Sequence, residues 1–303
     1  LMRTYISSAF LAAAVPPAIQ GRSFAKVPWS WEPAIVLPLV ILVAVYTAGS
    51  FRRGSIHTLR WRHVSFYVGW LTLALALMSP IHELGEQLFS AHMLQHEILI
   101  LVSAPLISAS HPGATLLWAF APCHRANLGG WVRTIEHAAP IALLTRPLSA
   151  WLLEAAALWI WHIPALYQAT LTSNWIHAAQ HLSFFVTAVL FWSALYGVGR
   201  SAMSYGAATF YVFGTAAHCS ALGALLTFST VLWYPAYRLT TQPWGLSPLQ
   251  DQQLGGVIMW VPSGLVFVVI GLAVFAKWLR ESDNRLLHTS LQTALDAAKG
   301  DPS

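Results

Sequence analysis

The chain has 303 residues, of which 56% are hydrophobic and 9% are charged. Soluble domains carry about 25% charged residues, so this composition excludes a soluble globular domain and indicates an integral membrane protein. The formal net charge is +5. The basic residues gather in loops between apolar segments, which is a sign of membrane topology and not of nucleic-acid binding. Cys123 and Cys219 form no CxxC pair, so a thiol redox centre is not expected.

Residues 1–32 form an N-terminal segment before the first long apolar stretch. An apolar run follows Met2 and Arg3, and Ser23-Phe24-Ala25 lies downstream of it. This arrangement resembles a short signal peptide. An uncleaved N-terminal segment is the equal alternative.

Residues 33–280 are expected to form one all-α polytopic membrane domain, a bundle of seven transmembrane helices. The predicted spans cover residues 33–49, 64–80, 89–107, 147–163, 175–195, 207–232 and 251–275. Loop 51–62 carries four arginines, and Lys277 and Arg280 follow the last span. Because basic loops stay on the cytoplasmic side, we expect the N-terminus outside and the C-terminus inside. Residues 281–303 are expected to be a polar cytoplasmic tail, disordered in part.

Two histidine pairs with the same spacing lie at the expected outer ends of two spans. They are His92 and His96 in one span, and His177 and His181 in the other. Residues four apart share one face of a helix, and neutral imidazole is the commonest nitrogen ligand of metals. The two pairs therefore predict a metal site with four candidate ligands.

Other residues are candidate additions to this site. His162 and His218 are further metal-ligand candidates, and Met93 would add a soft sulfur that suits Cu(I). Carboxylates often accept hydrogen bonds from the ring N–H groups of ligating histidines. The carboxylates expected in that role are Asp251, Glu83, Glu86 and Glu97. A single histidine at a membrane interface is more often structural, and His82, His162 and His218, taken singly, belong to that class.

Several motifs together resemble the CtaG family of caa3-type cytochrome c oxidase assembly factors, the multi-span membrane type. The motifs, in order between residues 34 and 278, are His92-Met-Leu-Gln-His96, Trp161-His162-Ile-Pro164, His177-x3-His181, Leu222-Gly-Ala-Leu-Leu and Leu249-Gln-Asp-Gln-Gln-Leu-Gly-Gly256. The resemblance implies a protein of the bacterial inner membrane that helps a haem–copper oxidase to mature. Its partners would be cytochrome c oxidase subunits and the lipid bilayer.

The hypothesis that follows is a non-enzymatic assembly factor that binds copper at the outer histidines and delivers it to the oxidase. Two alternatives stay open from the residues alone. One is a membrane redox protein or enzyme that holds iron or haem between histidine-bearing helices. The other is a metal-free scaffold whose histidines are structural.

Overall fold

The computed structural model describes the backbone of residues 27–54, 60–197 and 203–299, and the side chains of these ranges up to residue 283. Within those ranges the chain is helical and contains no strand, which confirms the all-α prediction. The elements are α2 (Pro33–Arg53), α3 (Arg60–Met78), α4 (Pro80–Gly85), α5 (Phe89–Glu97), η3 (Ile98–Ser103), α6 (Ala104–Ser110), α7 (Pro112–Trp118), α8 (Pro122–His137), α9 (Ala139–Leu144), α10 (Pro147–Trp161), α11 (Pro164–Thr170), α12 (Asn174–Leu195), α13 (Tyr205–Thr227), η4 (Pro235–Leu239), η5 (Gln242–Trp244) and α14 (Pro248–Lys299). The predicted signal-peptide features lie outside the described residues.

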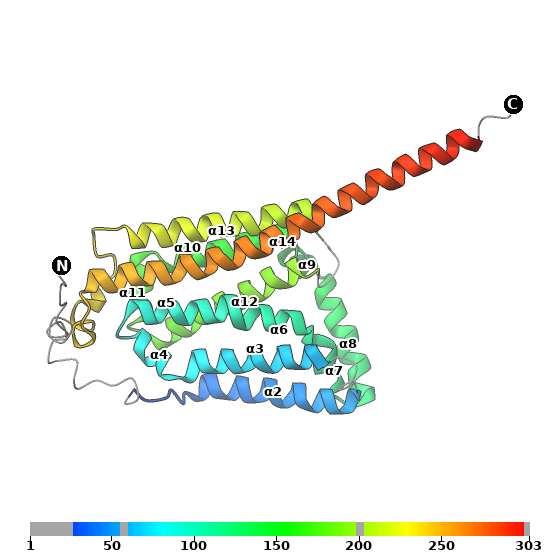
Figure 1. Cartoon of the computed structure of the whole chain (residues 1–303). Helices are drawn as coiled ribbons and strands as arrows, with labels where there is room; N and C mark the ends of the chain where they lie inside the picture. Colours follow the sequence, from blue (N-terminus) through cyan, green and yellow to red (C-terminus); the bar gives the residue numbers. More distant parts are fainter. Residues whose placement is uncertain (1–26, 55–59, 198–202, 300–303) are drawn as a thin grey trace, which may run out of the picture.

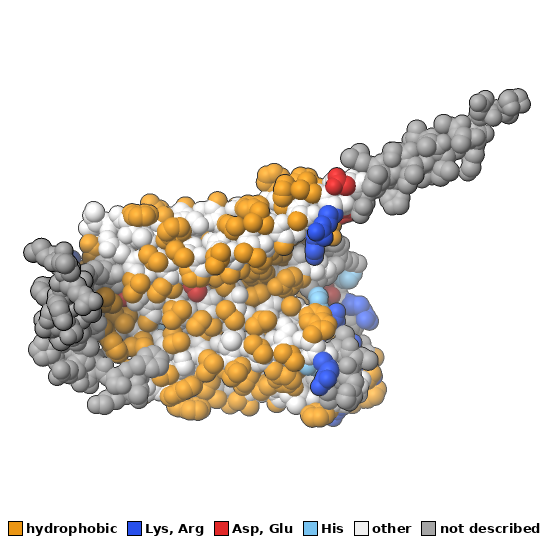
Figure 2. All heavy atoms as spheres, in the orientation of Figure 1, with side chains coloured by type: hydrophobic (Ala, Val, Ile, Leu, Met, Phe, Trp, Pro, Cys, Tyr) orange, Lys and Arg blue, Asp and Glu red, His pale blue; other side chains and the backbone are white. Residues whose placement is uncertain are grey.

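The long helices run side by side along one axis and form an elongated bundle (Figure 1). The short helices α4 and α11 lie at one end, and α7 and α8 lie at the other. Hydrophobic side chains cover the side of the bundle in view, and Lys and Arg side chains gather at the end where α7 and α8 lie (Figure 2). An apolar surface next to a basic end is typical of a protein that spans a lipid bilayer.

Five helices in the described part of the chain are long and apolar enough to cross a membrane. They are Pro33–Arg53, Phe89–Ser110, Asn174–Leu195, Tyr205–Thr227 and Pro248–Asp283. The expected number of seven spanning helices is not confirmed, because α3 and α10 fall outside this set. Helix α3 carries Arg60, Arg62 and His63 in its first turn, and α10 has only 15 residues, short of the roughly 20 that span a bilayer.

Helix α14 continues well past the bundle, as Figure 1 shows. The tail expected from residue 281 was predicted to be disordered in part, but its backbone is helical to Lys299. Residues 286–299 include four Leu and three Ala, and both are strong helix formers.

The third long helix changes register in its middle. Between α5 and α6, η3 is a π-helix, and the backbone N–H of Ala104 bonds to the carbonyl of Leu99. In that register the carbonyl of Ile100 faces Pro105, which has no N–H to donate. The indole N–H of Trp192 on α12 donates to this carbonyl at 2.8 Å instead. One side chain therefore compensates for the proline and ties α12 to the π-helical segment.

Glycines allow α14 to approach its neighbours closely. A Cβ at Gly256 would lie 2.8 Å from the Gly223 carbonyl oxygen on α13, and a Cβ at Gly255 would lie 2.3 Å from the Phe89 ring on α5. Small residues at such crossings let membrane helices pack backbone to backbone. Packing at Gly255 places the start of α14 against the start of α5, where the first histidine pair lies.

Candidate metal centre

His82 lies on a short helix whose start is defined by the sequence. The Ser79 hydroxyl accepts a hydrogen bond from the backbone N–H of Ile81, and Pro80 occupies the first helical position. Serine at the N-cap and proline directly after it are favoured at helix starts. The short α4 helix that results folds back against α5 and buries His82 to 6% exposure.

Helices α5 and α12 each contribute a histidine pair. The rings of His92 and His96 lie 4.4 Å apart, and those of His177 and His181 lie 4.3 Å apart. Both distances reflect the four-residue spacing on one helix face. The pairs face each other, since the His92 and His177 rings stack at 5.1 Å. We call the combined group the histidine cluster; it consists of His82, His92, His96, His177 and His181.

The cluster contains two groups of three with the geometry to hold a metal ion. His82, His177 and His181 form the first, named here the cavity triad. His92, His96 and His181 form the second, named the deep triad. In each triad one ring nitrogen from every histidine lies within 4.8 Å of the other two. Metal–imidazole bonds of 2.0–2.1 Å need only small side-chain movements from this arrangement, and His181 belongs to both triads.

Ring nitrogens of four cluster histidines are buried without a hydrogen-bond partner among the described residues. They are His92 Nδ1, His96 Nδ1 and Nε2, His177 Nε2 and His181 Nε2. Buried polar atoms are normally paired, because leaving one unpaired costs about 1–3 kcal/mol. A neutral imidazole has one N–H and one lone pair, so each of these four histidines can offer at most one lone pair to a bound cation.

Two glutamine side chains hold the rings of the cluster. Gln180 Oε1, on α12, accepts a hydrogen bond from His92 Nε2 at 3.2 Å. Gln95, on α5, lies 3.0 Å from His82 Nδ1 and also donates to the Ala76 carbonyl. Gln180 Oε1 is the kind of acceptor that fixes the orientation of a ligating ring, whereas Gln95 donates through Nε2 to His82 Nδ1.

His162 and Met93 lie beside the cluster rather than within it. His162 Nδ1 donates to the Leu158 carbonyl at 2.7 Å, and its Nε2 lies 3.4 Å from Met93 Sδ. The Phe184 ring separates His162 from His96. This imidazole–thioether pair is a soft donor set next to the deep triad.

The remaining predicted residues lie elsewhere or act otherwise. His218 Nε2 faces Glu154 Oε2 at 3.5 Å, apart from the cluster. Glu97 has a buried oxygen, Oε2, without a hydrogen-bond partner in the described chain. Glu83 follows His82 on α4, and its charge opposes the lowering of the His82 pKa that burial causes. His218, Glu97 and Glu83 belong to neither triad.

Asp251 supports the site from a distance instead of accepting a ring N–H. Its carboxylate accepts hydrogen bonds from the backbone N–H groups of Phe89 and Ser90 and from the Ser90 hydroxyl. A carboxylate at a helix N-terminus satisfies free N–H groups and the helix dipole. Asp251 is fully buried, so it positions α5 and with it His92 and His96.

An aromatic wall closes the cluster on the side of α11 and η4. The Tyr167 ring lies 5.1 Å from His92, its hydroxyl lies 2.9 Å from that of Tyr237, and the Tyr237 hydroxyl donates to the Gly85 carbonyl at 2.8 Å. Burial raises the pKa of Tyr167 and of Tyr237 above the usual range. Both phenols therefore stay neutral and act as fixed walls.

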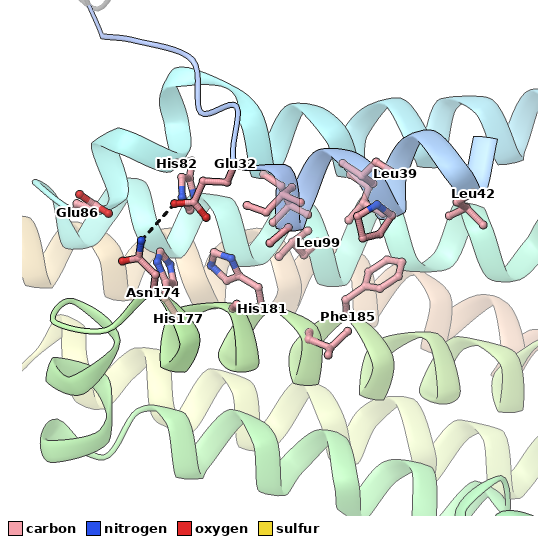
Figure 3. Close-up of a pocket in the computed structure, with 17 residues that line it drawn as sticks. Glu32, Leu39, Leu42, His82, Glu86, Leu99, Asn174, His177, His181 and Phe185 are labelled. Carbon is pink, nitrogen blue, oxygen red and sulfur yellow. Dashed lines mark hydrogen bonds between the residues drawn. The ribbon is translucent and has the colours of Figure 1, made fainter. Parts of the chain in front are cut away.

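On the opposite side the cluster borders a cavity of about 370 Å³ between α2 and α12, named here the α2–α12 cavity. Figure 3 shows His82, His177 and His181 along it, with Glu32, Glu86 and Asn174 at one end and Leu39, Leu42 and Phe185 at the other. Asn174 Nδ2 donates to Glu32 Oε1 at 3.3 Å. The cavity triad is therefore bordered by an open space, whereas His92 of the deep triad is fully buried.

The sequence prediction missed His82 and both glutamines. His82 could have been found from the length of its connection. Residues 79–88 form a short link between two spans, so their side chains must lie at the same end of the bundle as the histidine pairs. The glutamines have a weaker signal. Gln95 and Gln180 each directly precede the second histidine of a pair.

The comparison with known families agrees with the resemblance seen in the motifs. The family described as cytochrome c oxidase caa3 assembly factor matches residues 40–281, which is most of the chain. This chain belongs to that family. The matched region contains every member of the histidine cluster, the two glutamines and Asp251.

Similar curated proteins come from mycobacteria. An uncharacterised protein of Mycobacterium leprae is 26% identical over 269 residues, which are 85% of this chain and 40% of the relative. An uncharacterised protein of Mycobacterium bovis is 27% identical over 266 residues, 84% of this chain and 40% of the relative. The chain thus spans less than half the length of these relatives. No solved structure matches it.

Proposed function

We propose that this caa3 assembly factor binds copper at the histidine cluster and supplies it to a cytochrome c oxidase in the bacterial inner membrane. The observation that carries the proposal is the set of unpartnered ring nitrogens in the cluster. Four buried histidines each leave a ring nitrogen unpartnered within the described chain, and a cation would satisfy one lone pair on each of them.

Copper is favoured over other metals by the donor set and by the family. Imidazole suits copper and zinc, and thioether sulfur favours Cu(I); the cluster offers five imidazoles, and Met93 lies next to it. The family assembles an oxidase of the caa3 type, and our proposal makes copper the cargo that this oxidase needs.

The cluster is proposed to face the outer side of the membrane. Arg52 and Arg53 end α2, Arg125 and Arg133 lie on α8, and Arg146 precedes α10. This basic end is opposite the end at which α4 and α11 lie. Basic residues mark the cytoplasmic side, so copper would be taken up and released externally.

A carrier must release its ion, and two features favour release. The cluster has two triads that share His181, so an ion can move between them without leaving the protein. The cavity triad also borders an open space rather than packed side chains. A closed structural site would have neither feature.

The test is the metal content and absorption spectrum of the detergent-purified chain, as isolated and after anaerobic loading with Cu(I). Wild type should hold about one copper per chain, and His181→Ala should lose it. His124→Ala is the matched control, because His124 is an exposed histidine on α8 at the other end of the bundle. Iron or a haem absorption band would instead support the redox alternative, and no metal at all would support the metal-free scaffold.

A further inference from the structure

Access to the histidine cluster is open from one side among the described residues. The aromatic wall of Tyr167 and Tyr237 closes one face. His92 and His96 are 0% and 3% exposed and do not line the α2–α12 cavity. The cavity triad does line it. An ion that arrives through this cavity therefore meets the cavity triad before the deep triad.

The polar end of the cavity carries two carboxylates. Glu32 directly precedes α2, and Glu86 directly follows α4. Desolvation raises the pKa of Glu86, and the charges of Glu83 and Glu32 raise it further. A cation near these carboxylates would offset the repulsion between their charges.

Two histidines with unpartnered ring nitrogens line the same cavity. His177 Nε2 and His181 Nε2 are buried without a hydrogen-bond partner in the described part of the chain, and both residues are 6% exposed. In Figure 3 the side chains of Glu32, His82, Asn174 and His177 lie together at the polar end, with His181 next along the cavity. Carboxylates thus stand in front of free imidazole ligands along one path.

We propose that Glu32 and Glu86 form a capture site for a hydrated divalent cation, which then passes to the cavity triad and through His181 to the deep triad. This inference rests on the proposed function. The carboxylates attract the ion by charge while its water shell is intact, and an ion of charge +2 is attracted twice as strongly as one of charge +1. The imidazoles then replace water one at a time. The ion stays divalent along this path, because imidazole nitrogens also ligate Cu²⁺, and no oxidation or reduction is involved.

The hydrogen bond from Asn174 to Glu32 defines a clean variant. In Glu32→Gln the side-chain oxygen can still accept from Asn174, so the contact between α2 and α12 is kept and only the charge is removed. Glu86→Gln likewise keeps size and polarity. Glu83→Gln is the matched control, because Glu83 lies on α4 beside His82 but does not line the cavity.

The experiment follows Cu²⁺ binding to the full chain in detergent by stopped-flow quenching of tryptophan fluorescence, with bound copper per chain measured at equilibrium. The Glu32→Gln/Glu86→Gln variant should bind Cu²⁺ about tenfold more slowly, as expected for loss of local electrostatic attraction, with the same copper content at equilibrium. Glu83→Gln should slow binding less than twofold.

A wild-type rate in the double variant would overturn the capture site, and so would equal slowing in Glu83→Gln, which would indicate only a general field. A wild type that binds Cu(I) at equilibrium but not Cu²⁺ would also overturn it while leaving the proposed function intact. A wild type that binds copper in neither form would refute the proposed function itself, so the two failures are distinguishable.

Discussion

Replacement of His181 is expected to weaken copper binding far more than replacement of any other cluster histidine. His181 belongs to both triads, whereas His82 belongs only to the cavity triad and His92 only to the deep triad. His181→Ala removes one ligand from each possible site. His82→Ala and His92→Ala each leave one complete triad.

The magnitudes differ by enough to measure. Structural zinc sites of four ligands bind with about 10–16 kcal/mol, which is about 3 kcal/mol per ligand. At 1.4 kcal/mol per factor of ten, His181→Ala should lower copper affinity about 100-fold. Loss of one of two equivalent triads removes only a statistical factor of about two, so His82→Ala and His92→Ala should remain near the wild-type affinity.

The assay is competition between the purified chain and a chromophoric Cu(I) chelator, for the three variants and for His124→Ala as the exposed control. Thermal melting of each variant without copper checks that the fold is kept. Equal losses of about 100-fold in His82→Ala, His92→Ala and His181→Ala would refute the two-triad reasoning, because they would mean that one ion uses ligands from both triads at once.

Three further outcomes are expected. Asp251→Ala should lower the free energy of unfolding by about 3 kcal/mol, because the carboxylate accepts three hydrogen bonds at the start of α5. The control is Asp283→Ala, on an exposed part of the same helix, which should change the melting temperature in detergent little. Equal melting temperatures of the two variants would contradict the argument. Gly256→Ala should destabilise the folded protein by about 1–3 kcal/mol, since its Cβ would lie 2.6 Å from Thr227 Oγ1. Gly264→Ala is the control: its Cβ would meet nothing closer than 3.7 Å, so it should not lower the melting temperature. Copper affinity should be constant from pH 8 to 7 and fall only below about pH 6.5. A ligand histidine must be neutral, and burial lowers the pKa of His82 beneath its usual 6.5. A fall in affinity between pH 8 and 7 in the chelator assay would count against histidine ligation.

The sequence alone was sufficient for the features that depend on local periodicity. Apolar runs predicted helices, and the four-residue spacing of His92 with His96 and of His177 with His181 predicted that each pair shares a face. These predictions succeed because a helix fixes side-chain direction within a few residues. The motifs also indicated the family, which the match over residues 40–281 confirms.

The tertiary structure decided which helix faces meet. It brought His82 into the cluster by folding α4 onto α5, and it placed His218 against Glu154 instead. It also assigned Asp251 to the start of α5. The rotation of one helix against another depends on contacts between residues far apart in sequence, such as Gly255 with Phe89 and Trp192 with the Ile100 carbonyl. A one-dimensional pattern carries no record of those contacts, so the two triads and the cavity beside them could be found only in the folded chain.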